Sequence, residues 1–234
     1  MGRWMILSHE TARAFWRAYG DRYSHAHRLV VSGRFMTKVT FKAAEVVAHS
    51  FNLPLPLHVM TLEPKEGSRS ERYIKHIFAM ARRLPCVMEI SDGLYVVCPE
   101  LCFVQVAQVL QPVDLIKWGF EICGSYMPDP QGVAKQRFRR ELCTPEGLRE
   151  FIDGIDSRFN GIVAARKALR YVIPGSASPA ETAFEAQMHI IARTMGRRIR
   201  IADPSGFTRK QLELRARLAP WLVPAAFAPR YSAS

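Results

Sequence analysis

The hydrophobic pattern changes its period twice along the chain, and this alternation constrains the fold more than any other feature. Up to residue 52, apolar side chains recur at the spacing that buries one face of an α-helix. Short apolar runs follow, separated by proline and glycine, and this pattern is typical of β-strands. These runs occupy 57–62, 74–78, 87–90 and 94–97. From residue 99 the helical spacing returns, so the sequence predicts an α+β fold with N-terminal helices, a small, mostly antiparallel sheet and a helical C-terminal half.

Capping residues place the boundaries of the first helices. Ser8 precedes one helical pattern, with Glu10 in its first turn, and Gly20 stands where that helix would stop. Thr40 is predicted to begin a second helix. Its predicted buried face consists of Phe41, Ala44, Val47, Ala48 and Phe51. The stretch between the two helices, 21–38, is rich in arginine and histidine and is interpreted as a basic connector.

Turn and cap signals organise the rest of the chain. Asp92-Gly93 between two short apolar runs predicts a β-hairpin. The sharpest helix start is Ser178-Pro179-Ala180-Glu181, which combines a capping box with proline at the first helical position. Helices are predicted at 99–110, 113–123, 144–155, 161–172, 178–195 and 208–218, with a short strand at 197–202.

Composition shifts divide the chain into four parts. An α+β domain is predicted over 1–126, where helices accompany the sheet. Pro128, Pro130 and Gly132 crowd into a predicted linker over 127–136. A helical basic region follows over 137–219, and 220–234 is predicted to be a loose tail.

The charge balance indicates the partner. The chain has 33 Lys and Arg against 21 Asp and Glu, a net charge of +12. Such a surface attracts polyanions, so nucleic acid is the predicted partner, with an anionic membrane second and charge that only maintains solubility as the alternative. No apolar run approaches the roughly 18 residues of a membrane span. Five irregularly spaced cysteines and no signal peptide predict a cytoplasmic protein with reduced thiols.

No complete catalytic constellation is present in the sequence. The serine-hydrolase elbow, the Walker loop, the dinucleotide fingerprint and the zinc-protease motif are all absent, so no catalytic residue, metal site or cofactor is predicted. Cys98 and Cys102 share a helix face, but no further ligand pair completes a zinc site, and the pair is interpreted as core. A nuclease site built from Glu63, Lys65 and Glu89 stays open as an alternative.

The histidines give no motif. His25 and His27 are interpreted as part of a solvated loop, although their spacing would also place both on one face of a strand. The remaining histidines are scattered along the sequence without a recognisable nucleophile–base arrangement. These are His9, His49, His58, His76 and His189.

A C-terminal cluster of cations is the strongest candidate site. It falls between residues 193 and 217, and only Asp203 and Glu213 oppose it. Arginines on alternate strand positions suit phosphate contacts, so the cluster is interpreted as a nucleic-acid face. Its members are Arg193, Arg197, Arg198, Arg200, Arg209, Lys210, Arg215 and Arg217.

Five phrases resemble one known family. They are LSHETA at 7–12, VCPELC at 97–102, EICGSY at 121–126, AARKAL at 164–169 and SASPAET at 176–182. Together, over roughly residues 5–185, they resemble actinobacterial proteins related to the AbiEi-type antitoxins of abortive-infection systems. Many members of that group carry a C-terminal endonuclease domain similar to the very-short-patch-repair fold. Cys98 departs from the pattern, since relatives commonly have serine before Pro-Glu.

The resemblance implies an antitoxin-like protein that has lost its nuclease core. In that group the Ser-Pro-x-Glu helix leads into the catalytic elements, and none of these follows Glu181 here. No catalytic residue is therefore transferred. The resulting hypothesis is a non-catalytic, DNA-associated protein of toxin–antitoxin type, which binds phosphates through the C-terminal cations and pairs with a protein such as a cognate toxin. The alternatives are a divalent-metal endonuclease, or a remnant of one, and a protein-interaction module.

Overall fold

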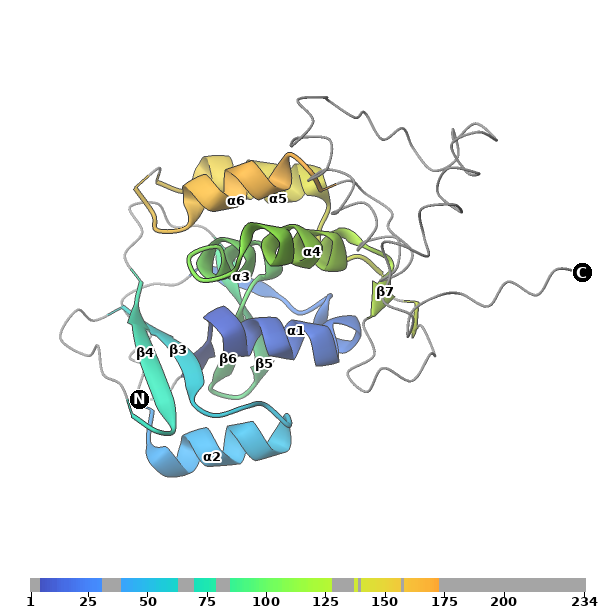
Figure 1. Cartoon of the computed structure of the whole chain (residues 1–234). Coiled ribbons are helices and arrows are strands. Elements are labelled where there is room, and N and C mark those ends of the chain that lie inside the picture. Colours follow the sequence, from blue (N-terminus) through green and yellow to red (C-terminus); the bar gives the residue numbers. More distant parts are fainter. Residues whose placement is uncertain are drawn as a thin grey trace, which may run out of the picture.

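The computed structural model (Figure 1) describes seven stretches of the chain. These are residues 5–30, 39–62, 70–78, 85–127, 137–138, 140–156 and 158–172. The strands are β1 (Met5–Leu7), β2 (Arg28–Val30), β3 (Leu57–Thr61), β4 (Tyr73–Ile77), β5 (Pro85–Ser91), β6 (Leu94–Val97), β7 (Tyr126–Met127) and β8 (Arg137–Phe138). The helices are α1 (His9–Tyr23), α2 (Phe41–Ser50), α3 (Pro99–Val106), α4 (Pro112–Cys123), α5 (Pro145–Gly154) and α6 (Ile162–Leu169). Within these stretches, no helix has the length and apolar character of a membrane span.

Six strands form a mixed sheet in the order β2-β5-β6-β1-β3-β4. Three of its pairings are antiparallel and two are parallel, β1 with β6 and β3 with β4. The α+β class is therefore confirmed, and the four strands predicted between residues 57 and 97 are all present, whereas the strand predicted at 197–202 lies outside the described stretches. The sequence did not predict β1, although it lies inside the sheet. Its three residues are all buried and show no alternation that would mark a strand.

The first helix is longer than predicted. Gly20 does not end it, because α1 continues to Tyr23 with Gly20 buried within it. Phe15 lies 5.4 Å from both Tyr19 and Tyr23, measured between ring centroids, so the last turn packs on the aromatic core. Ser8 occupies the N-cap position as predicted, but its side chain makes no capping hydrogen bond.

The basic connector predicted at 21–38 is wrong for the part that the structure describes. Its first residues complete α1, and Arg28–Val30 forms β2, the edge strand that pairs with β5. The Arg28 guanidinium donates to Glu100 Oε1 at 2.9 Å, so this cation holds the edge strand to the start of α3. Residues 31–38 lie outside the described stretches.

Threonine caps and the hairpin turn follow the prediction. Thr40 Oγ1 accepts from the Ala43 amide at 3.2 Å and Thr144 Oγ1 from the Gly147 amide at 3.0 Å. Gly93 adopts a φ of 73° in the turn between β5 and β6. The predicted buried face of α2 is confirmed for Ala44 and Ala48, which are buried, but is wrong for Phe41, which is 58% exposed.

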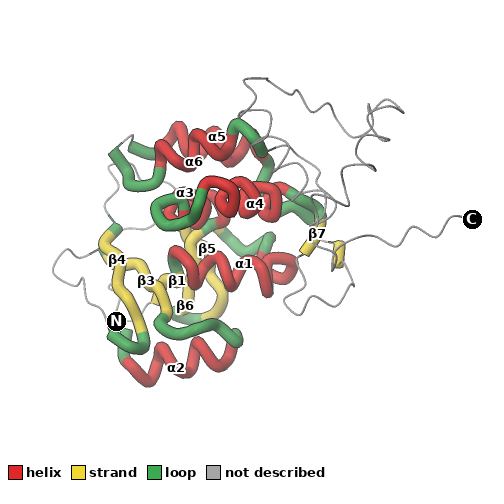
Figure 2. Tube along the Cα trace, in the orientation of Figure 1, coloured by secondary structure: helices red, strands yellow, loops and turns green. Residues whose placement is uncertain are grey.

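The helices form successive layers beside the sheet. Figures 1 and 2 show α3 and α4 between α1 on one side and α5 with α6 on the other. Trp16 of α1 is fully buried, and its indole N–H donates to the Val97 carbonyl at 2.9 Å. One hydrophobic core includes residues of α1 to α6, so it continues past the segment predicted as a linker. Helices α5 and α6 therefore belong to the same packed body as the sheet.

Candidate functional site

The residues assigned to nucleic-acid binding lie outside the described stretches. This holds for all eight cations between Arg193 and Arg217, and also for Glu63 and Lys65 of the alternative nuclease site. Glu89 is exposed on β5, where its carboxylate accepts a long hydrogen bond of 3.4 Å from the Tyr95 hydroxyl. Over the stretches that the structure describes, no group of three His, Cys, Asp or Glu side chains is placed to hold a metal ion.

All five cysteines are free and buried. Cys98 is the N-cap of α3, where its sulfur accepts from the Leu101 amide at 3.5 Å, and Cys102 follows one turn later. Burial raises the pKa of both thiols. The sulfurs of Cys123 and Cys143 lie 3.9 Å apart, and that hydrogen bond, together with burial, raises the pKa of Cys143. The cysteines of the described body thus form part of its core.

Burial predicts how these thiols react. In the native protein we expect no cysteine to be labelled by a maleimide on a timescale of minutes, because the reagent needs an accessible thiolate. In denaturant all five should be labelled, as counted by mass spectrometry. Val109→Cys is the control, since Val109 is 64% exposed and the new thiol should react in the folded protein. Native-state labelling of Cys98 or Cys102 would contradict the buried assignment.

Three histidines that are distant in sequence meet at the start of α1. His9 begins α1, His58 lies on β3 and His76 on β4. The rings of His9 and His76 stack with centroids 3.7 Å apart, and those of His58 and His76 are 5.0 Å apart. His76 Nε2 and His58 Nδ1 are 3.0 Å apart and share a hydrogen bond. The two exposed histidines before β2, His25 and His27, take no part in this cluster.

Sequence spacing could not reveal this histidine cluster. His58 and His76 face one another because β3 and β4 pair in parallel with Met60 opposite His76, which places the two histidines on neighbouring positions of one sheet face. His9 joins them because β1 pairs with β3 through Leu7 and Val59. The cluster therefore depends on the register of β1, β3 and β4. Of these, β1 and β3 are separated by a long stretch of sequence.

His9 is held in an unusual conformation by contacts on both sides. Its φ is 49°, a left-handed value that a side chain with a Cβ rarely adopts. The His9 amide donates to Gln105 Oε1 at 3.1 Å, and the Cys102 thiol donates to the His9 carbonyl at 3.7 Å. His9 Nδ1 lies 3.1 Å from the hydroxyl of Ser8. These contacts fix the imidazole over His76.

The cluster strongly favours a neutral His9. Burial, and to a smaller extent the neighbouring His76 and His58, together lower the pKa of His9 to about 3. The nearest acid along α1, Glu10, pairs with Arg13 at 2.9 Å. Ser8 is fully buried, so its hydroxyl offers no accessible nucleophile beside this imidazole. A proton on His9 would therefore place a positive charge inside a packed cluster of imidazole rings.

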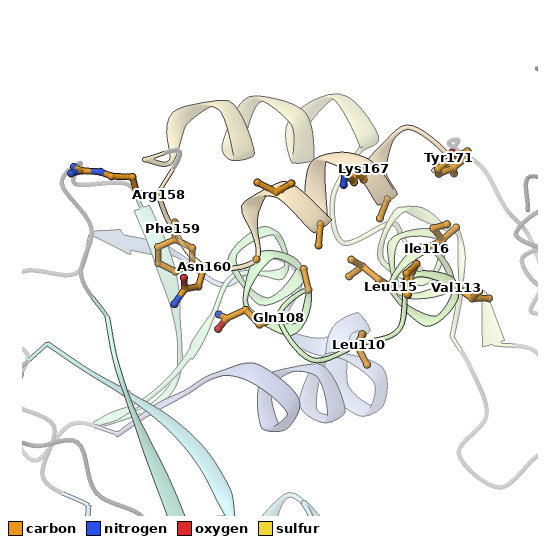
Figure 3. Close-up of a pocket in the computed structure, with 16 residues that line it drawn as sticks. Gln108, Leu110, Val113, Leu115, Ile116, Arg158, Phe159, Asn160, Lys167 and Tyr171 are labelled. Carbon is orange, nitrogen blue, oxygen red and sulfur yellow. The ribbon is translucent and has the colours of Figure 1, made fainter. Parts of the chain in front are cut away.

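A second feature is an open groove between α4 and α6 (Figure 3). Its volume is about 860 Å³, within the range of ligand and peptide sites. Figure 3 places Phe159 and Asn160 at one end and Tyr171 at the other, with Leu115 and Ile116 of α4 below Lys167 of α6. Most of the lining is apolar, and Val163 on its rim is 60% exposed. The sequence predicted the helices on either side of the groove but not the groove itself.

The outer side of α6 is basic. Arg166, Lys167 and Arg170 are exposed there, and the helix contains no acidic residue. Arg166 pairs with Asp153 of α5 at 3.3 Å. Arg158, in the turn before α6, pairs with Asp156 at 2.9 Å, and this contact lowers the pKa of Asp156 to about 2. Lys167 and Arg170 therefore contribute the unneutralised positive charge on this side of the described body.

The fold and these sites define an α+β protein with a histidine cluster and an apolar groove beside a basic helix. Comparison with known proteins yields no match among family models, curated proteins or solved structures.

Proposed function

We propose that this chain is a non-catalytic, DNA-associated cytoplasmic protein of toxin–antitoxin type, which binds nucleic-acid phosphates through the cations between Arg193 and Arg217. The resemblance of five phrases to AbiEi-type antitoxins supports the toxin–antitoxin assignment, and a cognate toxin is the partner that it implies. The basic character of the chain supports the nucleic-acid assignment, because phosphate contacts dominate the affinity of such proteins.

The distribution of charge carries the proposal. In the described stretches Lys and Arg nearly balance Asp and Glu, so almost all of the net charge of +12 belongs to the remaining residues. The cluster between Arg193 and Arg217 is the largest single part of that excess. A dense group of cations in one part of the sequence is typical of proteins that contact a phosphate backbone with one region.

Helix α6 and its C-cap add two exposed cations within the described body. Lys167 and Arg170 are exposed on the last helix before the C-terminal segment, and residues 173–234 begin directly after Val172. Two further phosphate contacts at this end of α6 would suit a nucleic acid that follows the C-terminal cations.

Salt dependence tests this proposal. We expect duplex DNA binding, measured by fluorescence anisotropy, to weaken about 1,000-fold or more between about 50 and about 200 mM salt, because each neutralised phosphate releases counterions. The triple variant Arg197→Gln, Arg198→Gln, Arg200→Gln should bind more weakly and reduce the slope of log K against log salt by about 3.

A cation on another surface provides the control. Arg22 is exposed near the end of α1, and Arg22→Gln should leave the affinity and the salt slope unchanged. Binding that does not depend on salt, or a triple variant that binds like the wild type, would reject the assigned cations. Cleavage of the DNA in the presence of Mg²⁺ or Mn²⁺, abolished by Glu63→Ala, would replace the proposal with the nuclease alternative.

A further inference from the structure

We infer that the groove between α4 and α6 is the seat of a segment of this same chain, residues 178–195, which the sequence predicts to be helical. This contact within the chain does not depend on DNA binding, and the experiment that tests it contains no nucleic acid.

The groove has the properties of a helix-binding surface. Leu110, Val163 and Ala164 line the groove with partly or largely exposed apolar side chains. Leu115 and Ile116 of α4 are buried and form its floor. Val163, which lines the groove, is 60% exposed, so it has apolar surface that a docked segment could remove from water. An amphipathic helix that lays its apolar face into such a groove removes that exposure.

The sequence of 178–195 supplies the matching face. Phe184, Met188, Ile191 and Met195 recur every three or four residues, which places them in one stripe along a helix. Glu181 and Glu185, four residues apart, fall on one flank of this stripe. Arg193 falls on the opposite side of the helix, so a helix seated by its apolar stripe would turn this arginine outward.

Charge and chain connectivity favour this segment over other occupants. Lys167 lies on the rim of the groove, where it complements the acidic flank formed by Glu181 and Glu185. Tyr171 lines the groove one residue before the described body ends at Val172. The short stretch 173–177 then separates the groove from the predicted helix, so the segment has a high effective concentration at this surface.

Hydrogen–deuterium exchange on the full chain tests the interface. We expect amides of 184–195 to exchange at least about tenfold more slowly than those of a free peptide of the same sequence. Val163→Asp and Met188→Asp should each remove this protection, because either change places a charge in an apolar contact. Lys167→Glu should reduce the protection, and the added change Glu185→Lys should restore it.

The chain offers a matched control for these variants. Val109 is 64% exposed but does not line the groove, so Val109→Asp should leave the protection of 184–195 unchanged. In every variant, slow exchange of the amides of α1 and α3 would show that the described body remains folded. Exchange of 184–195 at the rate of the free peptide, or protection that survives Val163→Asp, would overturn the inference. Protection that appears only as the protein dimerises at high concentration would overturn it as well, in favour of a second copy.

Discussion

Gly161→Ala should destabilise the folded protein by roughly 3 kcal/mol or more. Gly161 precedes α6 with a φ of 89°, a conformation that costs a residue with a Cβ about 1–2 kcal/mol. A Cβ at this position would also lie 2.3 Å from the carbonyl oxygen of Val104. Val104 is fully buried in α3, so its backbone cannot move aside. The measurement is the free energy of unfolding from denaturant titrations followed by circular dichroism.

Two comparisons separate the causes of this effect. Gly161→Asn should be nearly as destabilising as Gly161→Ala, because asparagine tolerates the left-handed conformation but brings the same Cβ into the Val104 carbonyl. Gly147→Ala is the matched control: Gly147 is helical, and its Cβ would meet only the exposed Thr144 hydroxyl, at 3.3 Å. Its effect should stay within about 1 kcal/mol. A Gly161→Ala protein as stable as the wild type would show that α6 does not approach α3 this closely.

The fold could be predicted where local chemistry determines the structure. Thr40 and Thr144 cap their helices through their own hydroxyls, and Gly93 supplies the positive φ of the hairpin. Of the strands that were not predicted, β1 and β2 of the large sheet have no such local signal. The three residues of β1 are all buried, so they show no alternation. Strand β2 begins with Arg28, whose charge suggested a connector in solvent, but the structure pairs Arg28 with Glu100. Such partners lie far apart in sequence, so spacing does not reveal them.

The same limit explains why the candidate sites were not found from the sequence. The histidine cluster needs β1, β3 and β4 in register, and no local motif connects His9 with His58 or His76. The groove consists of residues that a helical pattern marks as apolar, and periodicity does not distinguish a covered face from an open one. The cations between Arg193 and Arg217 were found from composition alone, and their assignment to nucleic acid stays a prediction.

Acid should destabilise the protein through His9. In the unfolded chain this imidazole takes up a proton near pH 6.5, whereas in the folded protein its pKa is about 3. Between pH 3 and pH 6.5 the unfolded state therefore binds more protons than the folded state. The stability that a neutral His9 contributes is present in full above pH 6.5 and is lost as the pH falls toward 3. Between pH 6.5 and pH 4.5 the loss from this one group should be about 2 kcal/mol.

His9→Asn isolates this contribution, because asparagine tolerates the φ of 49° and does not titrate. The free energy of unfolding, measured by denaturant titration at a series of pH values, should fall less steeply with acid in His9→Asn than in the wild type. His49→Asn is the control, since His49 is exposed near the end of α2 and outside the cluster, and its variant should keep the wild-type pH dependence. Equal slopes for the wild type and His9→Asn would mean that His9 is not held neutral against His76. If the slope does fall, the packing of α1 against β3 and β4 depends on an uncharged imidazole, because protonation of His9 would place positive charge against the stacked ring of His76.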